Sequence, residues 1–407
     1  MPRPVKCKGY LLSGFFNIKI YKTNSCCNYT KARKLMKICL VSNTAWSLFN
    51  FRNGVIKYLL TAGHQVFIIA PPDAFSEKLR QMGCSIVNIQ LSPKGINPIS
   101  DLKLLKSLYD NYKKISPDFI IHYTIKPNIY GSIASCLSNS SCIAITTGLG
   151  YTFVKKNWVA FIAKKLYKLA FRWPKEVWFL NEDDKHTFLS HNLIKPEQAV
   201  LLHGEGVDMQ FYSPRPKSKH DGNIRFLLIS RMLWDKGIGE FIEAARKIKK
   251  IYPHAQFQLL GACDVPNPSA ISRSLVTEWE NEGIIEYLGT TDDVRPFISQ
   301  ADCVVLPSFY REGIPRTLME AAAMAKPLIT TDNVGCRDLV INDKTGFLCK
   351  TKDADSLVQS CIKILKLSDE ERSLMGNAGR HFMSESFSES RVIKQYIDLL
   401  KKYCPSA

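Results

Sequence analysis

The 407-residue chain lacks the long apolar run that a transmembrane helix requires, since no stretch of 18 apolar residues occurs in it. Its 13 cysteines are odd in number and dispersed, with no C-x-x-C pair and no regular spacing. Disulfide frameworks and zinc sites use paired, regularly spaced cysteines. The sequence therefore argues against both and is typical of a protein in a reducing cytosol.

Several catalytic signatures are also missing. The chain has no P-loop, no G-x-S-x-G elbow and no H-E-x-x-H pair. Residues 148–150 begin a dinucleotide fingerprint, but Phe153 stands where the third glycine belongs, and no acid follows to bind a ribose. Residues 203–205 have the H-x-E spacing of zinc deaminases without the P-C-x-x-C partner. These absences argue against those enzyme classes.

Acidic residues are scarce in the first half of the chain. The whole sequence has 55 Lys and Arg against 37 Asp and Glu, a net charge of +18. Residues 1–215 carry 29 basic and 12 acidic residues, or +17, whereas residues 216–407 carry 26 and 25, or +1. An excess confined to one half predicts a polyanionic partner, such as a membrane surface, nucleic acid or a phosphorylated substrate. The alternative is a basic surface that serves solubility alone.

The first 35 residues differ from the rest. They hold 8 basic residues and no acidic one, and their apolar patch at 11–20 is interrupted by Asn17 and Lys19, with no small-residue cleavage site after it. The sequence MKICLVSN at 36–43 has the form of a start methionine followed by a first buried strand. We therefore expect residues 1–35 to be a disordered extension outside the fold.

From Met36 onward, short β-branched runs alternate with segments of helical length. Such alternation predicts parallel sheets covered by helices on both faces. Strands are expected at 38–42, 66–70, 86–89, 119–123, 143–146, 177–180, 200–202, 226–230, 256–260, 284–288, 303–306 and 328–331. Helices are expected at 51–62, 101–114, 158–171, 238–251, 270–282, 294–300, 317–325, 354–365, 370–384 and 390–402.

A polar stretch, SPRPKSKHDGN at 213–223, divides this alternation in two. We predict an α/β fold of two doubly wound, Rossmann-like domains that face a cleft. The expected domains are residues 36–212 and 224–385, joined by the linker 213–223, with a C-terminal helix at 386–407 that crosses back to the first domain. Ligands of such sheets bind at the carboxyl ends of the strands, so the cleft is the expected site.

The segment SFYREGIPRTLMEAAAMAKPLITTD at 308–332 carries the strongest chemical signal. A strand ends before a loop that contains Glu312 and Gly313, and Pro315 stands at the expected first helical position. A helix N-terminus beside a glycine is a phosphate-binding element. Glu312 and Glu320 are placed to bracket the hydroxyls of a sugar or ribose. The alternative is a capping acid and a solvated helix acid.

A second signal is ISRMLWDKGIGEFIEA at 229–244. Arg231 follows a strand, and Lys236 comes five residues later, before a helix. Two cations at the carboxyl edge of a sheet suit a diphosphate, because Arg binds oxygens as a fork and Lys as a point charge. The alternative is two exposed cations on a loop.

Together these segments resemble the retaining glycosyltransferases of family 4, which have the two-domain GT-B fold. The E-x7-E element corresponds to Glu312 and Glu320, the R-x4-K-G element to Arg231, Lys236 and Gly237, and GEGVD at 204–208 to the entry into the second domain. The resemblance implies that the second domain binds a nucleotide sugar, for which we expect a UDP-sugar.

The resemblance also implies a role for each of these residues. Arg231 and Lys236 would neutralise the donor diphosphate, and Glu320 would bind the ribose. Glu312 and the backbone of Gly313, Ile314 and Pro315 would hold the transferred sugar and its phosphate. We expect Arg231, Lys236 and Glu312 to act in catalysis.

First-domain segments narrow the resemblance. LFNFRNG at 48–54, HYTIKPNIYGS at 122–132, TTGLGYTF at 146–153 and FLNEDD at 179–184 resemble bacterial members that extend polyprenyl-diphosphate-linked glycans for O-antigen, capsule or protein glycosylation. The sequence departs from that pattern in two places. Residues 50–52 are Asn-Phe-Arg where many members are glycine-rich, and Ile125 stands where several relatives have histidine.

By this resemblance the first domain binds the acceptor. The expected acceptor-side residues are Arg52, Lys126, Gly148, Gly150 and Tyr151. His122 and Lys126 are nearby candidates for a catalytic role, although His122 could equally pack at a strand end. No general base is assigned.

The expected function is therefore transfer, with retention, of a hexose or N-acetylhexosamine from a nucleotide sugar to a lipid-diphosphate-linked glycan. No cofactor and no metal is expected, because protein cations stabilise the leaving diphosphate and the acids at 353–355 are expected to cap a helix. A nucleotide-sugar 2-epimerase or a soluble synthase of the same fold is the alternative enzyme. A nucleic-acid-binding protein is the alternative outside enzymes, and we expect no nucleic-acid partner.

The segment KKNWVAFIAKKLYKLAFRW at 155–173 fits a membrane-linked acceptor. Lys164, Lys168 and Arg172 share one helical face, whereas Trp158, Phe161, Ile162, Leu166 and Leu169 form an apolar stripe. Basic amphipathic helices lie on anionic membranes, so we expect a cytoplasmic protein bound peripherally to the inner face of the cytoplasmic membrane. The alternative is that the stripe covers the sheet.

Overall fold

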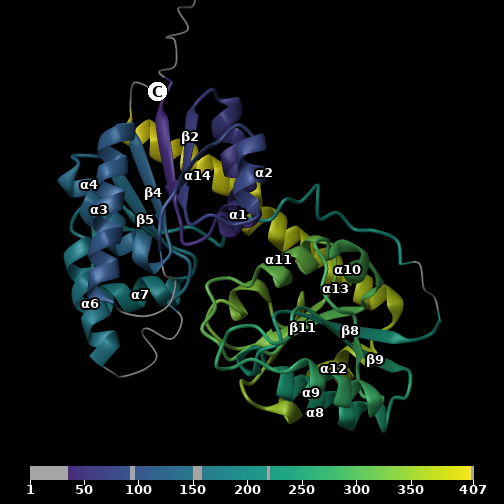
Figure 1. Ribbon diagram of the computed structural model, residues 1–407. Coiled ribbons are helices and arrows are strands. Elements are labelled where there is room, and N and C mark those ends of the chain that lie inside the picture. Colours follow the sequence, from purple (N-terminus) through teal and green to yellow (C-terminus); the bar gives the residue numbers. More distant parts are fainter. Residues whose placement is uncertain (1–34, 92–96, 150–157, 218–220, 405–407) are drawn as a thin grey trace, which may run out of the picture. The chain divides into compact units, whose positions relative to one another are not determined.

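The computed structural model describes residues 35–91, 97–149, 158–217 and 221–404, which belong to one compact unit. It contains two parallel sheets, shown in Figure 1. The first has the order β3-β2-β1-β4-β5-β6-β7 and the second the order β10-β9-β8-β11-β12-β13. Two parallel sheets, each built by alternation of strands and helices, confirm the predicted fold class.

The first sheet begins with a strand that pairs on both sides: the backbone of β1 runs parallel to β2 and to β4. The strands are β1 (Lys37–Val41), β2 (Gln65–Ala70), β3 (Ser85–Asn88), β4 (Phe119–Tyr123), β5 (Cys142–Thr146), β6 (Val177–Phe179) and β7 (Ala199–Leu201). The helices are α1 (Ala45–Thr61), α2 (Phe75–Gln81), α3 (Pro98–Ile115), the π-helix η1 (Pro127–Gly131), α4 (Ser132–Leu137), α6 (Trp158–Ala170) and α7 (Glu182–Ser190), followed by the short η2 (Pro196–Gln198).

The second sheet repeats this plan around β8. Its strands are β8 (Ile224–Ile229), β9 (Ala255–Leu260), β10 (Glu286–Tyr287), β11 (Cys303–Leu306), β12 (Leu328–Thr331) and β13 (Gly346–Cys349). The helices are η3 (Trp234–Lys236), α8 (Ile238–Lys249), α9 (Arg273–Asn281), α10 (Arg295–Gln300), α11 (Arg316–Ala323), η4 (Arg337–Leu339), α12 (Ala354–Lys366), α13 (Asp369–Ser386) and α14 (Glu389–Tyr403).

The last helix, α14, contacts α1 beside the first sheet, where Figure 1 shows it in yellow. Its anchor is the buried carboxylate of Glu176, which accepts hydrogen bonds from Lys402 Nζ at 2.7 Å and from the Tyr403 hydroxyl at 3.0 Å. A second bond joins the hydroxyls of Tyr396 and Tyr123 at 2.9 Å. The domain boundaries that the sequence suggested, and the extension at 1–35, stay predictions, since residues 1–34 lie outside the described part.

The structure corrects several expected elements. Helix α1 begins at Ala45 rather than at residue 51, because the Thr44 hydroxyl accepts a hydrogen bond from the Ser47 amide at 3.1 Å and caps the helix earlier. Strand β13 was not expected, whereas α2, α4 and α7 fall between expected strands, where helices were predicted without bounds. No helix of the described residues has the length and apolar character to cross a membrane.

Candidate functional site

A pocket of about 720 Å³ is lined by residues that follow the central strands of both sheets. Segment 42–52 after β1, residues 123–124 after β4 and residues 230–231 after β8 all line it, as does the loop between β11 and α11. Each residue predicted to bind a donor lines this pocket: Arg231, Lys236, Glu312, Gly313, Ile314, Pro315 and Glu320.

The two predicted diphosphate cations differ in their surroundings. Arg231 is exposed and makes no ion pair or side-chain hydrogen bond with the described residues. The ammonium of Lys236 pairs with the Glu312 carboxylate and lies 5.4 Å from the centre of the Tyr310 ring. Arg231 is thus a cation with no counter-charge among the described residues, as expected of a side chain that binds an anionic ligand.

The turn after Lys236 leaves no room for a side chain. Gly237 has a φ of 78°, and a Cβ there would lie 2.1 Å from the carbonyl oxygen of Pro307. The glycine therefore brings η3 against the strand β11 that precedes the Glu312 loop. This contact fixes Lys236 beside Glu312, whose carboxylate also accepts a hydrogen bond from Ser308 Oγ at 3.0 Å.

Helix α11 begins at Arg316, one residue before the predicted range 317–325, and Pro315 is its N-cap rather than its first helical residue. Pro315, Arg316 and Thr317 line the pocket. The first amides of a helix have no acceptor within the helix. The N-terminus of α11 consequently presents free N–H groups and the positive end of the helix dipole at the pocket wall.

Glu320 is buried in the wall of the pocket. Its Oε1 accepts hydrogen bonds from the Tyr212 hydroxyl and from Arg316 Nε, both at 2.8 Å. Burial and then the Glu320 carboxylate raise the pKa of Tyr212 well above its usual value, so the phenol stays protonated and donates. Oε2 makes no hydrogen bond with the described residues and is the oxygen left for a ligand.

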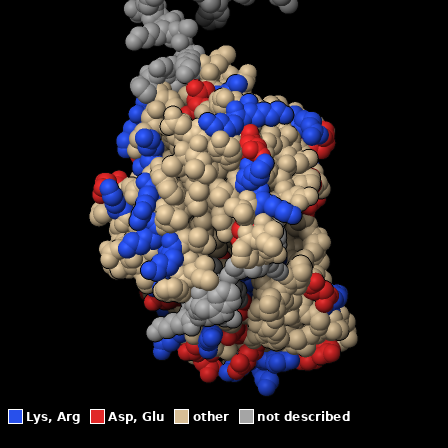
Figure 2. Space-filling model, turned by 60° about the vertical axis from the view of Figure 1, so that its left-hand side comes forward, with Lys and Arg blue, Asp and Glu red and all other residues tan. Residues whose placement is uncertain are grey.

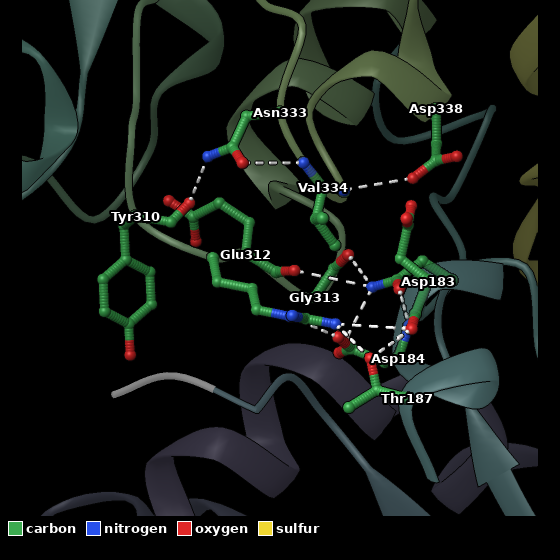
Figure 3. Close-up of polar contacts among 12 residues, drawn as sticks. Asp183, Asp184, Thr187, Tyr310, Glu312, Gly313, Asn333, Val334 and Asp338 are labelled. Atoms are coloured by element: carbon green, nitrogen blue, oxygen red, sulfur yellow. Dashed lines mark hydrogen bonds and ion pairs between the residues drawn. The ribbon is translucent and has the colours of Figure 1, made fainter. Parts of the chain in front are cut away.

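The loop that carries Glu312 is held by residues after β6, as Figure 3 shows. Asp184, whose side chain is fully buried, accepts a hydrogen bond from Arg311 Nε at 2.8 Å. Asn181 Nδ2 donates to the Gly313 carbonyl at 2.8 Å. Burial raises the pKa of Asp184, and the Arg311 guanidinium opposes that shift. These contacts fix the backbone on both sides of Glu312.

The loop is also packed tightly at its glycine. A Cβ on Gly313 would lie 2.5 Å from the Thr147 carbonyl oxygen, and a Cβ on Gly148 would lie 3.0 Å from the Gly313 amide. Only glycine permits this backbone approach. Gly148, predicted on the acceptor side, therefore packs directly against the loop that carries Glu312 and Gly313.

The two predicted acceptor-side cations are not free. Lys126 lines a second pocket of about 450 Å³ together with Gly148, but its ammonium pairs with Asp101 at 2.8 Å. Arg52 is buried and bonds Glu205 at 2.6 Å, with its guanidinium 4.7 Å from the Tyr123 ring centre. Each cation therefore already has a carboxylate partner in the fold. Gly150 and Tyr151 lie outside the described residues.

His122 is corrected from a catalytic candidate to a packed residue. Its ring is fully buried, lines neither pocket and bonds the Tyr112 hydroxyl at 3.0 Å. A Cβ on Gly131 would lie 2.5 Å from the ring, which shows how closely η1 covers it. Burial lowers the pKa of His122 to about 3, so the ring is neutral at physiological pH.

Comparison with known proteins decides the family. The family model Glycosyl transferases group 1 matches residues 212–382, and Glycosyl transferase 4-like matches residues 37–181. N,N'-diacetylbacillosaminyl-diphospho-undecaprenol alpha-1,3-N-acetylgalactosaminyltransferase of Campylobacter jejuni is 30% identical over 380 residues, which cover 89% of this chain and 98% of that protein. The chain belongs to this glycosyltransferase family.

A second relative of the glycosyltransferase is UDP-Gal:alpha-D-GlcNAc-diphosphoundecaprenol alpha-1,3-galactosyltransferase of Escherichia coli, which is 26% identical and covers 75% of this chain and 81% of its own length. Solved structures confirm the GT-B fold. A Rickettsia africae glycosyltransferase superimposes with a TM-score of 0.76 at 20% identity, over 92% of this chain and 100% of its own. The structure of HepE of Anabaena in complex with UDP and glucose superimposes with a TM-score of 0.73 at 17% sequence identity, over 90% of this chain and 99% of its own.

Sequence reasoning missed several residues of the glycosyltransferase's pocket and its supports. Tyr212, Asn181 and Asp184 support the predicted donor residues, and Trp46 lines the pocket from α1. Only Trp46 carried a local signal, as a large aromatic residue just after the first strand. Asn181 and Asp184 lie in the FLNEDD segment that carries the resemblance, but the partners of these two residues and of Tyr212 lie more than 100 positions away, so no local pattern indicates the contacts.

Proposed function

We propose that this glycosyltransferase moves a hexose or N-acetylhexosamine from a UDP-sugar to a polyprenyl-diphosphate-linked glycan, with retention at the anomeric carbon. The observation that carries the proposal is the single pocket in which Arg231, Lys236, the α11 N-terminus and Glu320 lie together. Two relatives support the substrates: the names of both contain a diphosphoundecaprenol acceptor, and one contains the donor UDP-Gal.

In this proposal the residues act on the charge that develops as the anomeric C–O bond breaks. The departing nucleoside diphosphate gains negative charge, which Arg231, Lys236 and the free amides of α11 stabilise. Lys236 exchanges part of its contact with Glu312 for a phosphate oxygen, leaving the Glu312 carboxylate to bind the sugar. Glu320 Oε2 accepts a hydrogen bond from a ribose hydroxyl.

A membrane-linked acceptor requires a surface that meets the membrane, and the exposed side of α6 supports such a role. Phe161 is 63% exposed and Leu169 43%, whereas Tyr167 and Ala170 are buried on the opposite side of the helix. The sheet is thus covered by Tyr167 and Ala170, and much of the predicted apolar stripe faces outward. Lys165 lies 5.4 Å from the Phe161 ring centre.

The neighbouring surface extends this feature. Ile99 and Leu102 of α3 are 69% and 66% exposed, and both α3 and α6 contact η1. Figure 2 brings forward the side on which α3, α4 and α6 lie in Figure 1, and Lys and Arg side chains gather there. We propose that this surface binds the anionic inner face of the cytoplasmic membrane.

The test is a transfer assay. The purified protein is incubated with UDP-glucose, UDP-galactose, UDP-N-acetylglucosamine or UDP-N-acetylgalactosamine and with N-acetylglucosaminyl-diphosphoundecaprenol or its N,N'-diacetylbacillosaminyl counterpart. We expect one donor to add a single sugar mass to a lipid acceptor, with an α-linkage in the proton NMR spectrum of the product. A parallel series with EDTA tests the expectation that no metal is needed, and we expect the rate there to be unchanged.

Three outcomes would contradict the proposal. Conversion of a UDP-sugar to its epimer without acceptor would identify a 2-epimerase, and transfer to soluble sugars but never to the lipid-linked ones would identify a soluble synthase. Salt-sensitive binding to DNA or RNA without any sugar transfer would favour the nucleic-acid alternative.

A further inference from the structure

Helix α1 places two aromatic side chains on the wall of the 720 Å³ pocket. The Trp46 and Phe51 rings meet edge to face, with centroids 5.1 Å apart and an interplanar angle of 81°. Trp46 is 46% exposed. Tryptophan is highly buried on average, so a half-exposed indole on a pocket wall indicates a surface that a ligand covers.

The backbone of Trp46 is fixed although its ring is open. The Trp46 amide donates to Asp73 Oδ2 at 2.8 Å, and its carbonyl accepts from Asn50 Nδ2 at 2.9 Å. The Arg316 guanidinium lies 5.4 Å from the Phe51 ring centre. A ring held on a fixed helix turn loses little freedom when a ligand covers it, which favours binding.

We propose that Trp46, supported by Phe51, stacks on the sugar ring of the lipid-linked acceptor. The inference rests on the proposed function and extends it by naming the acceptor-sugar site. A sugar presents apolar C–H groups on its ring face and hydroxyls at its edge. Trp46 offers a matching apolar face with a polar N–H at its rim.

The charges of the pocket assign this wall to the acceptor rather than to the donor. From the first half of the chain, the charged residues lining the pocket are Arg52 and Glu205, and these two pair with each other. Arg231, the cation that makes no ion pair with the described residues, comes from the second half. A wall whose charged side chains are already paired suits a neutral sugar, and it has no unpaired cation to bind a diphosphate.

The neighbours of Trp46 favour a sugar over a prenyl tail. Asn43, Thr44, Ser47 and Asn50 line the same wall. Hydroxyl and amide groups beside one aromatic face are the arrangement that binds a polyhydroxylated ring, since pocket specificity comes from a few placed polar groups on an apolar surface. The Asn43 Nδ2 and Asn50 Oδ1 atoms make no hydrogen bond with the described residues, and a prenyl tail would cover them without supplying a partner.

The test compares wild type with Trp46→Ala and Trp46→Phe in the transfer assay with N-acetylglucosaminyl-diphosphoundecaprenol or its diacetylbacillosaminyl counterpart, whichever wild type uses. We expect Trp46→Ala to raise the KM for that acceptor roughly five- to tenfold, the loss typical of one aromatic stacking contact. The KM for the UDP-sugar should change less than twofold. Trp46→Phe should recover most of the loss because it keeps an aromatic face.

Two controls distinguish a contact with the sugar from a contact with the lipid and from a general effect of removing an exposed side chain. Undecaprenyl phosphate carries the lipid without the sugar, and its inhibition constant should be the same for wild type and Trp46→Ala. Leu374→Ala removes an apolar side chain that is 69% exposed on α13 and lines neither pocket, and its acceptor KM should equal that of wild type. An unchanged acceptor KM in folded Trp46→Ala, or an equal loss of undecaprenyl phosphate inhibition, would overturn the inference.

A binding measurement separates this inference from the proposed function, because it needs no turnover. Tryptophan fluorescence is titrated with the methyl α-glycosides of N-acetylglucosamine and N,N'-diacetylbacillosamine. We expect a saturable change with at least one glycoside in wild type and none in Trp46→Phe. Absence of transfer by wild type would count against the proposed function, whereas identical titrations of the two proteins would count against the role of Trp46.

Discussion

The Tyr212 hydroxyl donates a hydrogen bond to Glu320 Oε1 at 2.8 Å across 108 positions of sequence. Arg316 Nε donates to the same oxygen from one helical turn away, also at 2.8 Å. Two donors on Oε1 hold the carboxylate in one orientation and leave Oε2 open toward the pocket. The residue predicted to bind a ribose is therefore oriented by a partner that precedes the second sheet.

Removing this partner should weaken donor binding without abolishing it. We expect Tyr212→Phe to raise the dissociation constant of UDP about three- to tenfold, since one hydrogen bond contributes about 0.5–1.5 kcal/mol and Arg316 still holds Oε1. Calorimetric titration with UDP measures this directly. Tyr109→Phe, on α3 away from the pocket, is the control, and equal affinities for UDP in both variants would show that Tyr212 does not orient Glu320.

Arg231 and Glu320 should differ in what their loss does to stability. We expect Arg231→Ala to lower kcat/KM at least about tenfold, because a hydrogen bond to a charged group contributes about 1.5–3 kcal/mol. Its melting temperature should stay that of wild type, since the Arg231 side chain has no partner in the described fold. Arg231→Lys should recover only part of the rate, because an ammonium cannot bind two phosphate oxygens in the bidentate geometry of a guanidinium.

Glu320→Ala should reduce transfer by at least about tenfold and also lower the melting temperature. The substitution leaves the buried Tyr212 hydroxyl and the Arg316 guanidinium without their acceptor, at a cost of about 1–3 kcal/mol. Thermal unfolding beside steady-state kinetics measures both effects. Near wild-type turnover in either folded variant would remove Arg231 or Glu320 from the donor site.

The two neighbouring acids after β6 should have unequal effects. We expect Asp184→Asn to destabilise the protein by about 1–3 kcal/mol and to lower kcat, because the buried carboxylate holds Arg311 beside Glu312. Asp183 pairs with Arg337 with both side chains more than a third exposed, so Asp183→Asn should cost less than about 1 kcal/mol. Urea unfolding and kcat are measured for both, and equal losses would contradict a positioning role for Asp184.

The strands, and the residues that line the pocket from the second sheet, were predictable because their signals are local. A buried parallel strand is a continuous apolar run, and predicted β4 and β11 match the structure to the residue. Strand β13 was missed because GFLC is only four residues long and begins with glycine. Helix α7 was given no bounds because only Phe188 and Leu189 of its nine residues are large and apolar, too few to form an apolar stripe at helical spacing.

The partners of the site residues were not predictable, since they depend on how distant segments pack. Arg52 and Lys126 were expected on the acceptor side, and no sequence pattern indicated that Glu205 and Asp101 pair with them from 153 and 25 positions away. The Asn181 bond to Gly313 spans 132 positions. A motif identifies which residues face a ligand, whereas the contacts that orient them follow from the tertiary fold.

The buried His122 predicts a dependence of stability on pH. Its folded-state pKa of about 3 lies below the unfolded value of about 6.5, so between these values the unfolded chain binds a proton that the folded chain does not. The contribution of His122 to the free energy of unfolding is complete above about pH 6.5. It decreases by about 1.4 kcal/mol per pH unit as the pH falls toward 3.

Urea midpoints at pH 7 and pH 5 test this dependence. Wild type should lose about 2 kcal/mol more over this range than His122→Gln, in which nothing titrates at that position. His381→Gln replaces a histidine whose side chain is 74% exposed and should behave as wild type does. The same pH dependence in wild type and His122→Gln would mean that His122 is not the group responsible.

Membrane binding should depend on both charge and apolar exposure on α6. We expect the protein to sediment with vesicles that contain phosphatidylglycerol and to leave neutral vesicles. Binding should weaken with salt, since the Debye length falls from about 10 Å at 0.1 M to about 3 Å at 1 M.

Two double variants test the two contributions separately. Charge reversal of Lys165 and Lys168 removes cations that each contribute about 1 kcal/mol at an anionic surface. Phe161→Ser with Leu169→Ser removes apolar groups that enter the interface. Both double variants should lose most of their vesicle binding yet keep the wild-type affinity for UDP. The matched controls are Lys247→Glu and Leu374→Ala, which alter exposed residues of α8 and α13. If the α6 variants bind vesicles as wild type does, the membrane contact is made elsewhere in residues 36–215, and Lys113 and Lys114 at the end of α3 are the next cations to reverse.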